Sequence, residues 1–217
     1  MLTLRLGTLI LIAATMCLLF APLQTLGASK TSQDSSYVFH GVYASGMSTV
    51  AIFDTDLSSS SESIDGVSAS GISNAVILGT GTVHKNFFLA IEGNFASHNA
   101  DFSGDILGND VEGDVEEGYG ASARIGGFPA QNMLTYCLAG WQQLNIDVSD
   151  NTGWSKDKSF DGVRLGLGME YQTRQNVFLR GEYNYTLYYE ETLSGGAEEY
   201  DMEPNASLFQ LGIGYRF

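Results

Sequence analysis

The last twelve residues, Ala206 to Phe217, read ASLFQLGIGYRF and contain the pattern that decides the fold. Side chains alternate between the two faces of a β-strand. One face is therefore wholly apolar and ends in aromatics, with Phe209, Leu211, Ile213, Tyr215 and Phe217. The other face combines Gln210, Gly212, Gly214 and Arg216. Such a face suits a narrow, partly polar lumen better than the dry core of a soluble sandwich, so we expect the apolar face to contact lipid.

The N-terminus has the pattern of a secretory signal peptide. An apolar run over residues 6–20 follows Arg5, and the small-residue stretch 25–28 comes after it. The run has about 15 residues, whereas a transmembrane helix needs roughly 20. We predict a signal peptide over residues 1–28, cleaved after Gly27 or Ala28. An uncleaved anchor is the alternative; lipidation of Cys17 is less favoured, because Met16 precedes it instead of a small residue.

Composition favours one all-β domain with a net charge of -15, 26 glycines and 3 prolines among 217 residues. Cleavage of the signal peptide would remove Cys17 and leave Cys137 as the single cysteine, so no intramolecular disulfide is expected in the mature chain. No other segment reaches the length of a transmembrane helix. A chain of this kind can cross a bilayer only as a closed barrel, in which every backbone group is paired.

Eight strands are predicted after a mobile lead over residues 29–36, in a barrel domain over residues 37–217. They cover about 37–50, 72–83, 86–96, 115–128, 133–146, 160–171, 177–187 and 206–217. Short turns at 84–85, 129–132 and 172–175 alternate with polar loops at 54–70, 97–114, 149–159 and 190–205. This alternation predicts an eight-stranded antiparallel up-and-down transmembrane β-barrel.

The expected strands are long enough to cross an outer membrane. About 11 to 14 residues at roughly 3.3 Å each, tilted about 40°, span some 28 to 35 Å, and the apolar band is about 25 Å tall. Both termini and the short turns are then expected on the periplasmic side, with the four long loops outside. Aromatic girdles are predicted at Tyr37, Phe95, Tyr136, Tyr171, Tyr183, Tyr185, Tyr215 and Phe217.

The alternation also assigns each residue to the lumen or to lipid. On the fifth strand we predict that Leu134, Tyr136 and Leu138 face lipid, while Cys137 faces the lumen as a small packing residue. Seven charged residues are expected in the lumen, namely Glu92, Arg124, Arg164, Glu170, Arg180, Glu182 and Arg216. Because a desolvated charge is costly unless it is paired, we expect these residues to form a network that fills the interior. A gated narrow pore lined by the same groups is the alternative.

Most acidic residues fall in the predicted loops. Seven carboxylates and no basic residue lie between Asp101 and Glu117, and six more acidic residues lie over 190–203. The spacing of Asp101, Asp105 and Glu112 faintly resembles a calcium loop, but Ile106 stands where the sharp turn needs glycine. We therefore expect a solvated acidic surface that takes up divalent cations diffusely. A nucleic-acid partner is disfavoured, because phosphate binding needs a basic patch.

No Ser/His/acid constellation is recognisable in the sequence. His40 is placed in the first strand, His84 in a periplasmic turn and His98 at an outer strand end. Only His98 would lie near the outer leaflet, and we expect it to have no catalytic role. The sequence therefore predicts no enzyme, no cofactor and no metal site, with lipid A modification as a remaining alternative.

The final quarter of the chain, about Gly162 to Phe217, resembles the small bacterial outer-membrane barrels called opacity-like or OmpA/OmpX-type. The resemblance rests on the segment 166–171, GLGMEY, on LRGEYNY over 179–185, and on the C-terminal signature Tyr215-Arg216-Phe217. It implies a surface-exposed protein of a Gram-negative outer membrane that contacts lipid and lipopolysaccharide. It also implies recognition of the last strand by the barrel-assembly machinery.

From this resemblance we expect a non-enzymatic protein that supports envelope integrity or contacts host or environmental surfaces. The alternative is a narrow porin-like channel for small solutes.

Overall fold

The computed structural model describes residues 38–59, 63–106, 109–150, 155–173, 176–189, 191–195 and 198–217. The predicted signal peptide and lead, together with Tyr37, lie outside these ranges. In the described part of the chain, no helix is long and apolar enough to cross a membrane.

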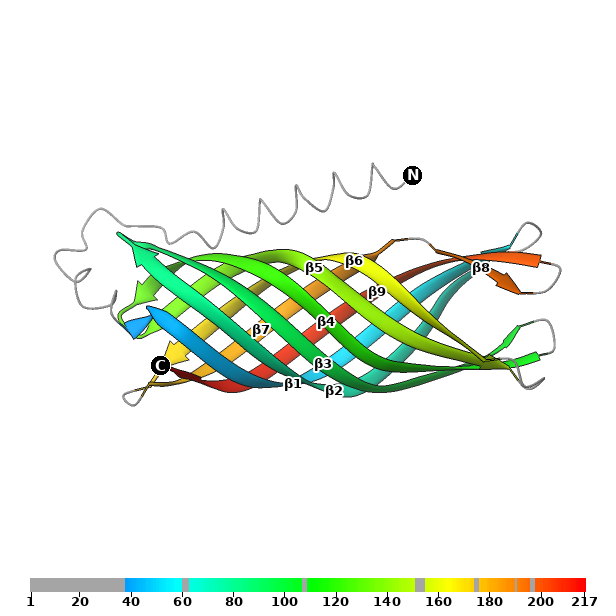
Figure 1. The fold of residues 1–217 in the computed structure, drawn as a ribbon, viewed down its shortest axis with the longest axis horizontal. Coiled ribbons are helices and arrows are strands. Elements are labelled where there is room, and N and C mark those ends of the chain that lie inside the picture. The colour runs from blue at the N-terminus through cyan, green and yellow to red at the C-terminus, as the bar shows by residue number, and fades with distance from the viewer. Residues whose placement is uncertain are drawn as a thin grey trace.

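Eight of the nine described strands form a closed antiparallel barrel, which confirms the predicted fold class (Figure 1). Strands β1 to β6 each pair with the next strand in sequence, β7 pairs with β9, and β1 pairs with β9 to close the sheet. The short strand β8 pairs only with β9 and stands outside the ring. The strands are β1 (Gly41–Ser59), β2 (Ser63–His84), β3 (Phe87–Ile106), β4 (Asn109–Ala130), β5 (Met133–Asp150), β6 (Ser155–Gln172), β7 (Val177–Tyr188), β8 (Glu191–Gly195) and β9 (Glu198–Arg216).

Strand pairing fixes the tilt of the barrel. Following the paired residues once around the ring from Ala44 leads back to Asp54 on the same strand, ten residues further along. An offset of this size in an eight-stranded barrel corresponds to strands inclined by roughly 40° to the axis. The interior is then just wide enough to be filled by side chains.

Most of the barrel strands are longer than predicted. Strands β1 to β6 have 18 to 22 residues each, and much of the four predicted loops is strand. The loop predicted over 190–205 contains β8 and the start of β9. The physical reason is that backbone pairing tolerates polar residues on both faces outside lipid, so the apolar alternation marks only the part of a strand that faces hydrocarbon.

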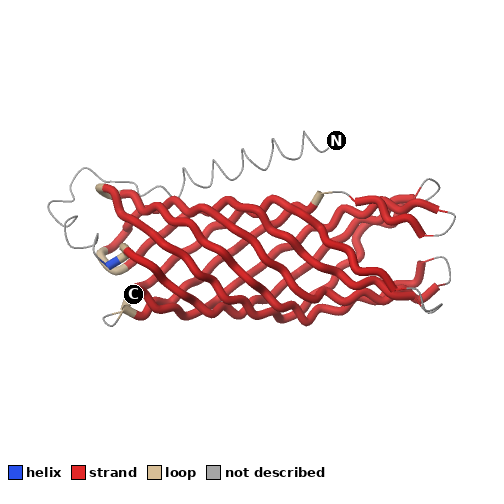
Figure 2. The backbone as a smooth tube through the Cα atoms, in the orientation of Figure 1, coloured by secondary structure: helices blue, strands red, loops and turns tan. Residues whose placement is uncertain are grey.

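Beyond the closed ring, the extended strands divide into two sheets. The pairing of β2 with β3 stops at Ile72 and Asn99, and the pairing of β6 with β7 stops at Gly162 and Tyr188. Past these points, β2, β1, β9 and β8 form one sheet, and β3, β4, β5 and β6 form the other. Figure 2 shows them as two separate arms at the end of the barrel opposite the C-terminus. We call this the extended end, and the other the short-turn end.

The predicted sidedness is correct on β3, β4, β6, β7 and β9. Outward residues of these strands, such as Ile91, Ile125 and Leu211, are exposed, while the inward Arg124 and Arg180 are buried. A ring of exposed apolar side chains therefore surrounds a buried polar interior. Its aromatic members include Phe95, Tyr119, Trp141, Tyr171, Tyr183, Tyr215 and Phe217.

The prediction for the fifth strand is wrong. On β5, Leu134, Tyr136 and Leu138 are at most 4% exposed, whereas Trp141 on the other face is 42% exposed. Cys137 therefore shares the outward face, and Tyr136 is not part of a girdle. The neighbouring strands explain the reversal: a Cβ added at Gly168 of β6 would collide with the Tyr136 ring. Large inward side chains of β5 fill the space that glycines leave on adjacent strands.

Candidate functional site

The lumen contains the densest group of polar residues in the described part of the chain. All seven charged residues predicted to face inward are 6% exposed or less. They lie on five strands of the barrel. Each is buried because it occupies an inward position of the alternation. They are Glu92 on β3, Arg124 on β4, Arg164 and Glu170 on β6, Arg180 and Glu182 on β7, and Arg216 on β9.

These residues form one continuous chain of ion pairs in which positive and negative groups alternate. We call it the ion-pair ladder. Its N–O distances run up to 3.1 Å, and each glutamate lies between two arginines. The order from the extended end is Arg164, Glu182, Arg180, Glu92, Arg124, Glu170 and Arg216.

Neutral side chains complete the coordination of the glutamates. Tyr43 donates its hydroxyl to Glu92 Oε1 at 2.7 Å, and Tyr136 donates to Glu182 Oε2 at 2.7 Å. Asn184 Nδ2 also donates to Glu182, at 2.7 Å to Oε1. Because each carboxylate accepts several charge-assisted hydrogen bonds, the ladder meets the conditions under which buried ion pairs are stable.

An aromatic and aliphatic cluster fills the short-turn half of the lumen. Arg124 Cζ lies 3.5 Å from the centroid of the Tyr136 ring, and Arg216 Cζ lies 5.2 Å from that of Phe178. The Phe39 and Phe128 rings pack with their centroids 5.0 Å apart. The buried members are Phe39, Tyr43, Phe88, Ala90, Leu134, Tyr136, Leu138 and Phe178. The sequence predicted that a network of ion pairs fills the interior and placed Leu134, Tyr136 and Leu138 on the lipid face, so this cluster is a correction.

A small cavity lies at the extended end of the ladder, with a volume of about 20 Å³. Arg164, Asn94, Gln142 and Gln210 line its polar side. His98 also lines it and is only 8% exposed, so this histidine faces the lumen and not the outer leaflet where the sequence placed it. A space of this size holds about one water molecule.

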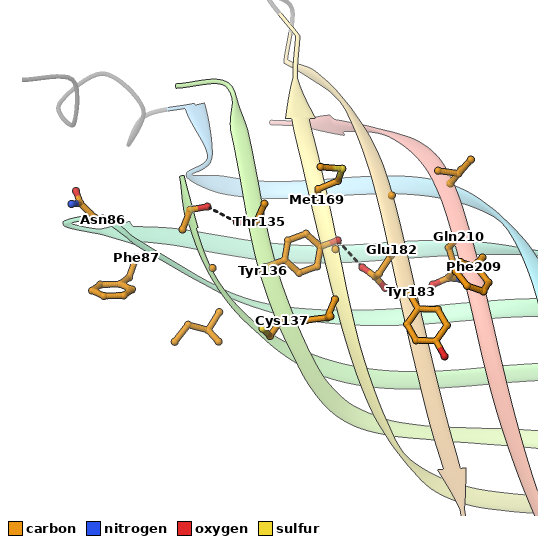
Figure 3. Close-up of a pocket in the computed structure, with 17 residues that line it drawn as sticks. Asn86, Phe87, Thr135, Tyr136, Cys137, Met169, Glu182, Tyr183, Phe209 and Gln210 are labelled. Atoms are coloured by element: carbon orange, nitrogen blue, oxygen red, sulfur yellow. Dashed lines mark hydrogen bonds between the residues drawn. The ribbon is translucent and has the colours of Figure 1, made fainter. Parts of the chain in front are cut away.

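A second depression lies on the outer wall, over β4, β5, β6, β7 and β9 (Figure 3). Its volume is about 920 Å³, and its lining is mostly apolar, with Leu167, Met169 and Leu211. Figure 3 also shows the hydrogen bond from Tyr136 to Glu182, which ties the wall to the ladder. Cys137 lines the depression.

The remaining predicted positions do not assemble into a second site. The His40 Nδ1 and Thr82 Oγ1 atoms are hydrogen-bonded at 3.3 Å near the short-turn end. His84 is the last residue of β2, beside the turn. Among the described residues, no group of three or more His, Cys, Asp or Glu side chains could hold a metal. The side chains of the calcium-loop-like segment over 101–112 lie outside those the structure describes. At the C-terminal signature, the rings of Tyr215 and Phe217 pack edge to face at 5.1 Å on the outer wall.

Among the other members of the lumen network, Gln210 was placed on the lumen face from the sequence, whereas Thr49 was missed. Thr49 accepts from Gln210 at 2.8 Å, and Gln210 accepts from Asn184 at 2.6 Å. Tyr43 and Phe39 were also missed as interior residues. Gln210 and Asn184 were assigned to the lumen by their inward positions on strands whose other face is apolar, whereas no polarity marked Phe39 or Tyr43 as residues of a polar lumen.

The chain is similar to known proteins in family, sequence and fold. The model of the outer membrane protein beta-barrel domain matches residues 14–217. A 22 kDa outer membrane protein of Rhizobium leguminosarum bv. viciae is 31% identical over 114 residues, which is 51% of this chain and 54% of that protein. The chain thus spans about half the length of the curated relative it matches.

Two solved outer-membrane barrels are similar in fold. The outer membrane protein OprG of Pseudomonas aeruginosa has a TM-score of 0.56 at 13% identity, with coverage of 82% of this chain and 96% of that one. Neisserial surface protein A has a TM-score of 0.50 at 18% identity, with coverage of 82% and 97%. At these identities the similarity concerns the fold.

Proposed function

Because the chain belongs to the outer membrane protein beta-barrel domain family and is an outer-membrane protein, we propose that it acts without catalysis, as a surface protein. In this proposal the extended end projects from the outer leaflet and contacts host or environmental surfaces. The short turns and the C-terminus face the periplasm, after cleavage of a signal peptide over residues 1–28. The membrane-facing wall contacts lipid and lipopolysaccharide, and the last strand with Tyr215, Arg216 and Phe217 is recognised by the barrel-assembly machinery.

The observation that carries this proposal is the division of the extended end into two sheets. Strands β3 and β4 stay paired out to Ile106 and Asn109, well past the exposed aromatics Phe95 and Tyr119. Two four-stranded sheets outside the lipid offer a large surface and free strand edges without disturbing the closed ring. Their sequences carry most of the acidic residues, so a cationic or neutral partner surface is favoured over an anionic one.

The test compares the adhesion of cells that carry wild-type protein with that of cells carrying a shortened β3–β4 hairpin. Joining the paired residues Asp101 and Asp114 through an Asn-Gly turn removes the tip and leaves the ring intact. A matched control keeps the hairpin but replaces Asp105, Asp110 and Glu112 by their amides. We expect the shortened variant to lose adhesion to amine-coated surfaces and the amide variant to lose part of it. Equal adhesion of all three, at equal surface amounts, would refute a role for these sheets.

A narrow channel is the second candidate, because the ladder runs through the lumen between the strands. The filled short-turn half argues for a structural interior instead, since Phe39, Phe88 and Phe178 are fully buried there. Conductance of the purified barrel in planar bilayers separates the two roles. A channel gated by the ladder would change its conductance in Glu182→Gln and Arg180→Gln, whereas we expect no conductance in wild type or in either variant.

A further inference from the structure

The ion-pair ladder begins and ends with an arginine. It contains four arginines and three glutamates, so among the buried side chains that the structure describes it carries one uncompensated positive charge. Each of the two inner arginines, Arg180 and Arg124, pairs with two glutamates, but each terminal arginine has one carboxylate partner. An unmatched charge in a desolvated interior is costly, because its attraction to surrounding water has been lost.

The two ends of the ladder differ in their surroundings. Arg216, at the short-turn end, donates to the backbone carbonyl of Phe39 at 3.1 Å. Arg164, at the extended end, donates from Nη1 to Asn94 Oδ1 at 3.1 Å and to Gln142 Oε1 at 3.2 Å. These neutral amides leave the charge of Arg164 half-compensated. Its buried Nε has no hydrogen-bond partner, and Arg164 lines the small cavity.

The cavity has the chemistry of a small anion site. Besides Arg164, the amides Asn94, Gln142 and Gln210 line it, and an amide nitrogen carries two donors. Asn94 Nδ2 uses one N–H on Gln142 and Gln210 Nε2 uses one on Thr49. The apolar residues Ala75, Ile77, Ala96 and Leu208 also line the cavity, together with Ser73, His98 and Tyr188. No glutamate or aspartate lines the cavity among the described residues.

We propose that this cavity binds a monatomic monovalent anion, chloride in the natural setting, which compensates the half-paired charge of Arg164 at the extended end of the ladder. A volume of about 20 Å³ admits one water-sized particle, so sulfate, phosphate and carboxylate anions are too large. The bound ion would hold Arg164 and the amide side chains in place between the ladder and the extended end.

Two measurements on the full barrel folded in detergent test the proposal. The first is the thermal unfolding midpoint in sodium chloride and sodium bromide against sodium gluconate at equal ionic strength. We expect a saturable rise in chloride and bromide of about 3 °C or more, since a ligand that binds only the folded state raises the midpoint. The second is a crystal grown in bromide, in which the anomalous signal should show one peak beside Arg164.

Three variants make the outcome specific. Arg164→Met removes the proposed partner of the anion, and Ala96→Val fills the cavity while keeping Arg164, so both should lose the halide-dependent rise. Arg216→Met removes the same charge at the other end of the ladder and should keep the rise. Equal midpoints in all three salts, a cavity without an anomalous peak, or a halide effect that survives Ala96→Val would each overturn the proposal. If Arg164→Met fails to fold, Ala96→Val and the bromide crystal still decide.

Discussion

Single glycines shape the lumen by making room for aromatic rings. Tyr43 pairs with Gly79, Tyr136 with Gly168 and Phe178 with Gly214 across neighbouring strands. A Cβ added at Gly79 would lie 2.6 Å from the Tyr43 ring, and one at Gly168 or Gly214 would also collide with the ring opposite. The inward glycines therefore mark the positions of inward aromatic rings on the neighbouring strands.

We predict that Gly168→Ala destabilises the barrel by about 1–3 kcal/mol, because the new methyl group displaces the Tyr136 ring from beneath Arg124 and from Glu182. Denaturant unfolding in lipid vesicles, followed by tryptophan fluorescence, measures this change. Gly93→Ala is the matched control. Gly93 faces outward, where an added Cβ meets nothing closer than the Gly120 carbonyl oxygen at 3.9 Å. Equal stability of the two variants would show that the ring does not fill this position.

A second prediction concerns Glu92, which accepts hydrogen bonds from Arg124, Arg180 and Tyr43. Glu92→Gln leaves two buried arginines without this carboxylate, so we expect a loss of about 3–5 kcal/mol in the free energy of unfolding. Glu117→Gln, at an exposed position of β4, removes the same negative charge outside the lumen and is the control. A Glu92→Gln barrel as stable as wild type would contradict the ladder.

At the scale of elements, β5 shows where periodicity stops being informative. Alternation located every barrel strand, but on β5 both faces contain apolar residues, so polarity could not say which face is inward. The ladder could be predicted because its residues lie on strands whose other face is plainly apolar. The order of its pairs depends on which residues the tilted register brings together across the lumen, and the strand patterns do not contain that information.

The reversal on β5 has a direct test in a pair of leucines. Leu138→Ala should cost about 2–5 kcal/mol, because it opens a cavity in a closed interior. Leu167→Ala, on the outward face of the adjacent β6, should cost less, since lipid or detergent chains fill the space. Both free energies come from denaturant unfolding under the same conditions. If Leu167→Ala were the more damaging change, the inward assignment of Leu138 would be wrong.

The protruding parts of the strands were missed for a related reason. A strand in lipid needs apolar side chains on its outer face, so apolar and polar residues alternate there, whereas a strand in water has no such requirement. Residues 54–59 and 97–106 therefore show no alternation of apolar residues, although they continue β1 and β3. Their strand structure rests on hydrogen bonds between backbones whose register is already set inside the membrane. A hairpin that leaves a closed ring in register can continue with any sequence that lacks a strong breaker.

At the scale of the whole molecule, the barrel has two chemically distinct ends. A lysine at each end allows the accessibility of that end to be measured from outside the cell. Lys85 lies in the β2–β3 turn at the short-turn end, where it is exposed, while Lys156 and Lys158 belong to β6 at the extended end. A membrane-impermeant amine reagent applied to intact cells should therefore modify Lys156 and leave Lys85 unmodified. Mass spectrometry of the extracted protein measures both.

Opening the outer membrane before labelling supplies the control, because Lys85 should then become reactive while Lys156 changes little. Heat-modifiable mobility on a gel shows in the same sample that the labelled protein is a folded barrel. The sidedness follows from the strand count: an even number of antiparallel strands places both ends of the barrel chain on one face. Modification of Lys85 in intact cells would show that the orientation is opposite to the proposed one. The two sheets of the extended end would then lie in the periplasm, where they could not contact another cell.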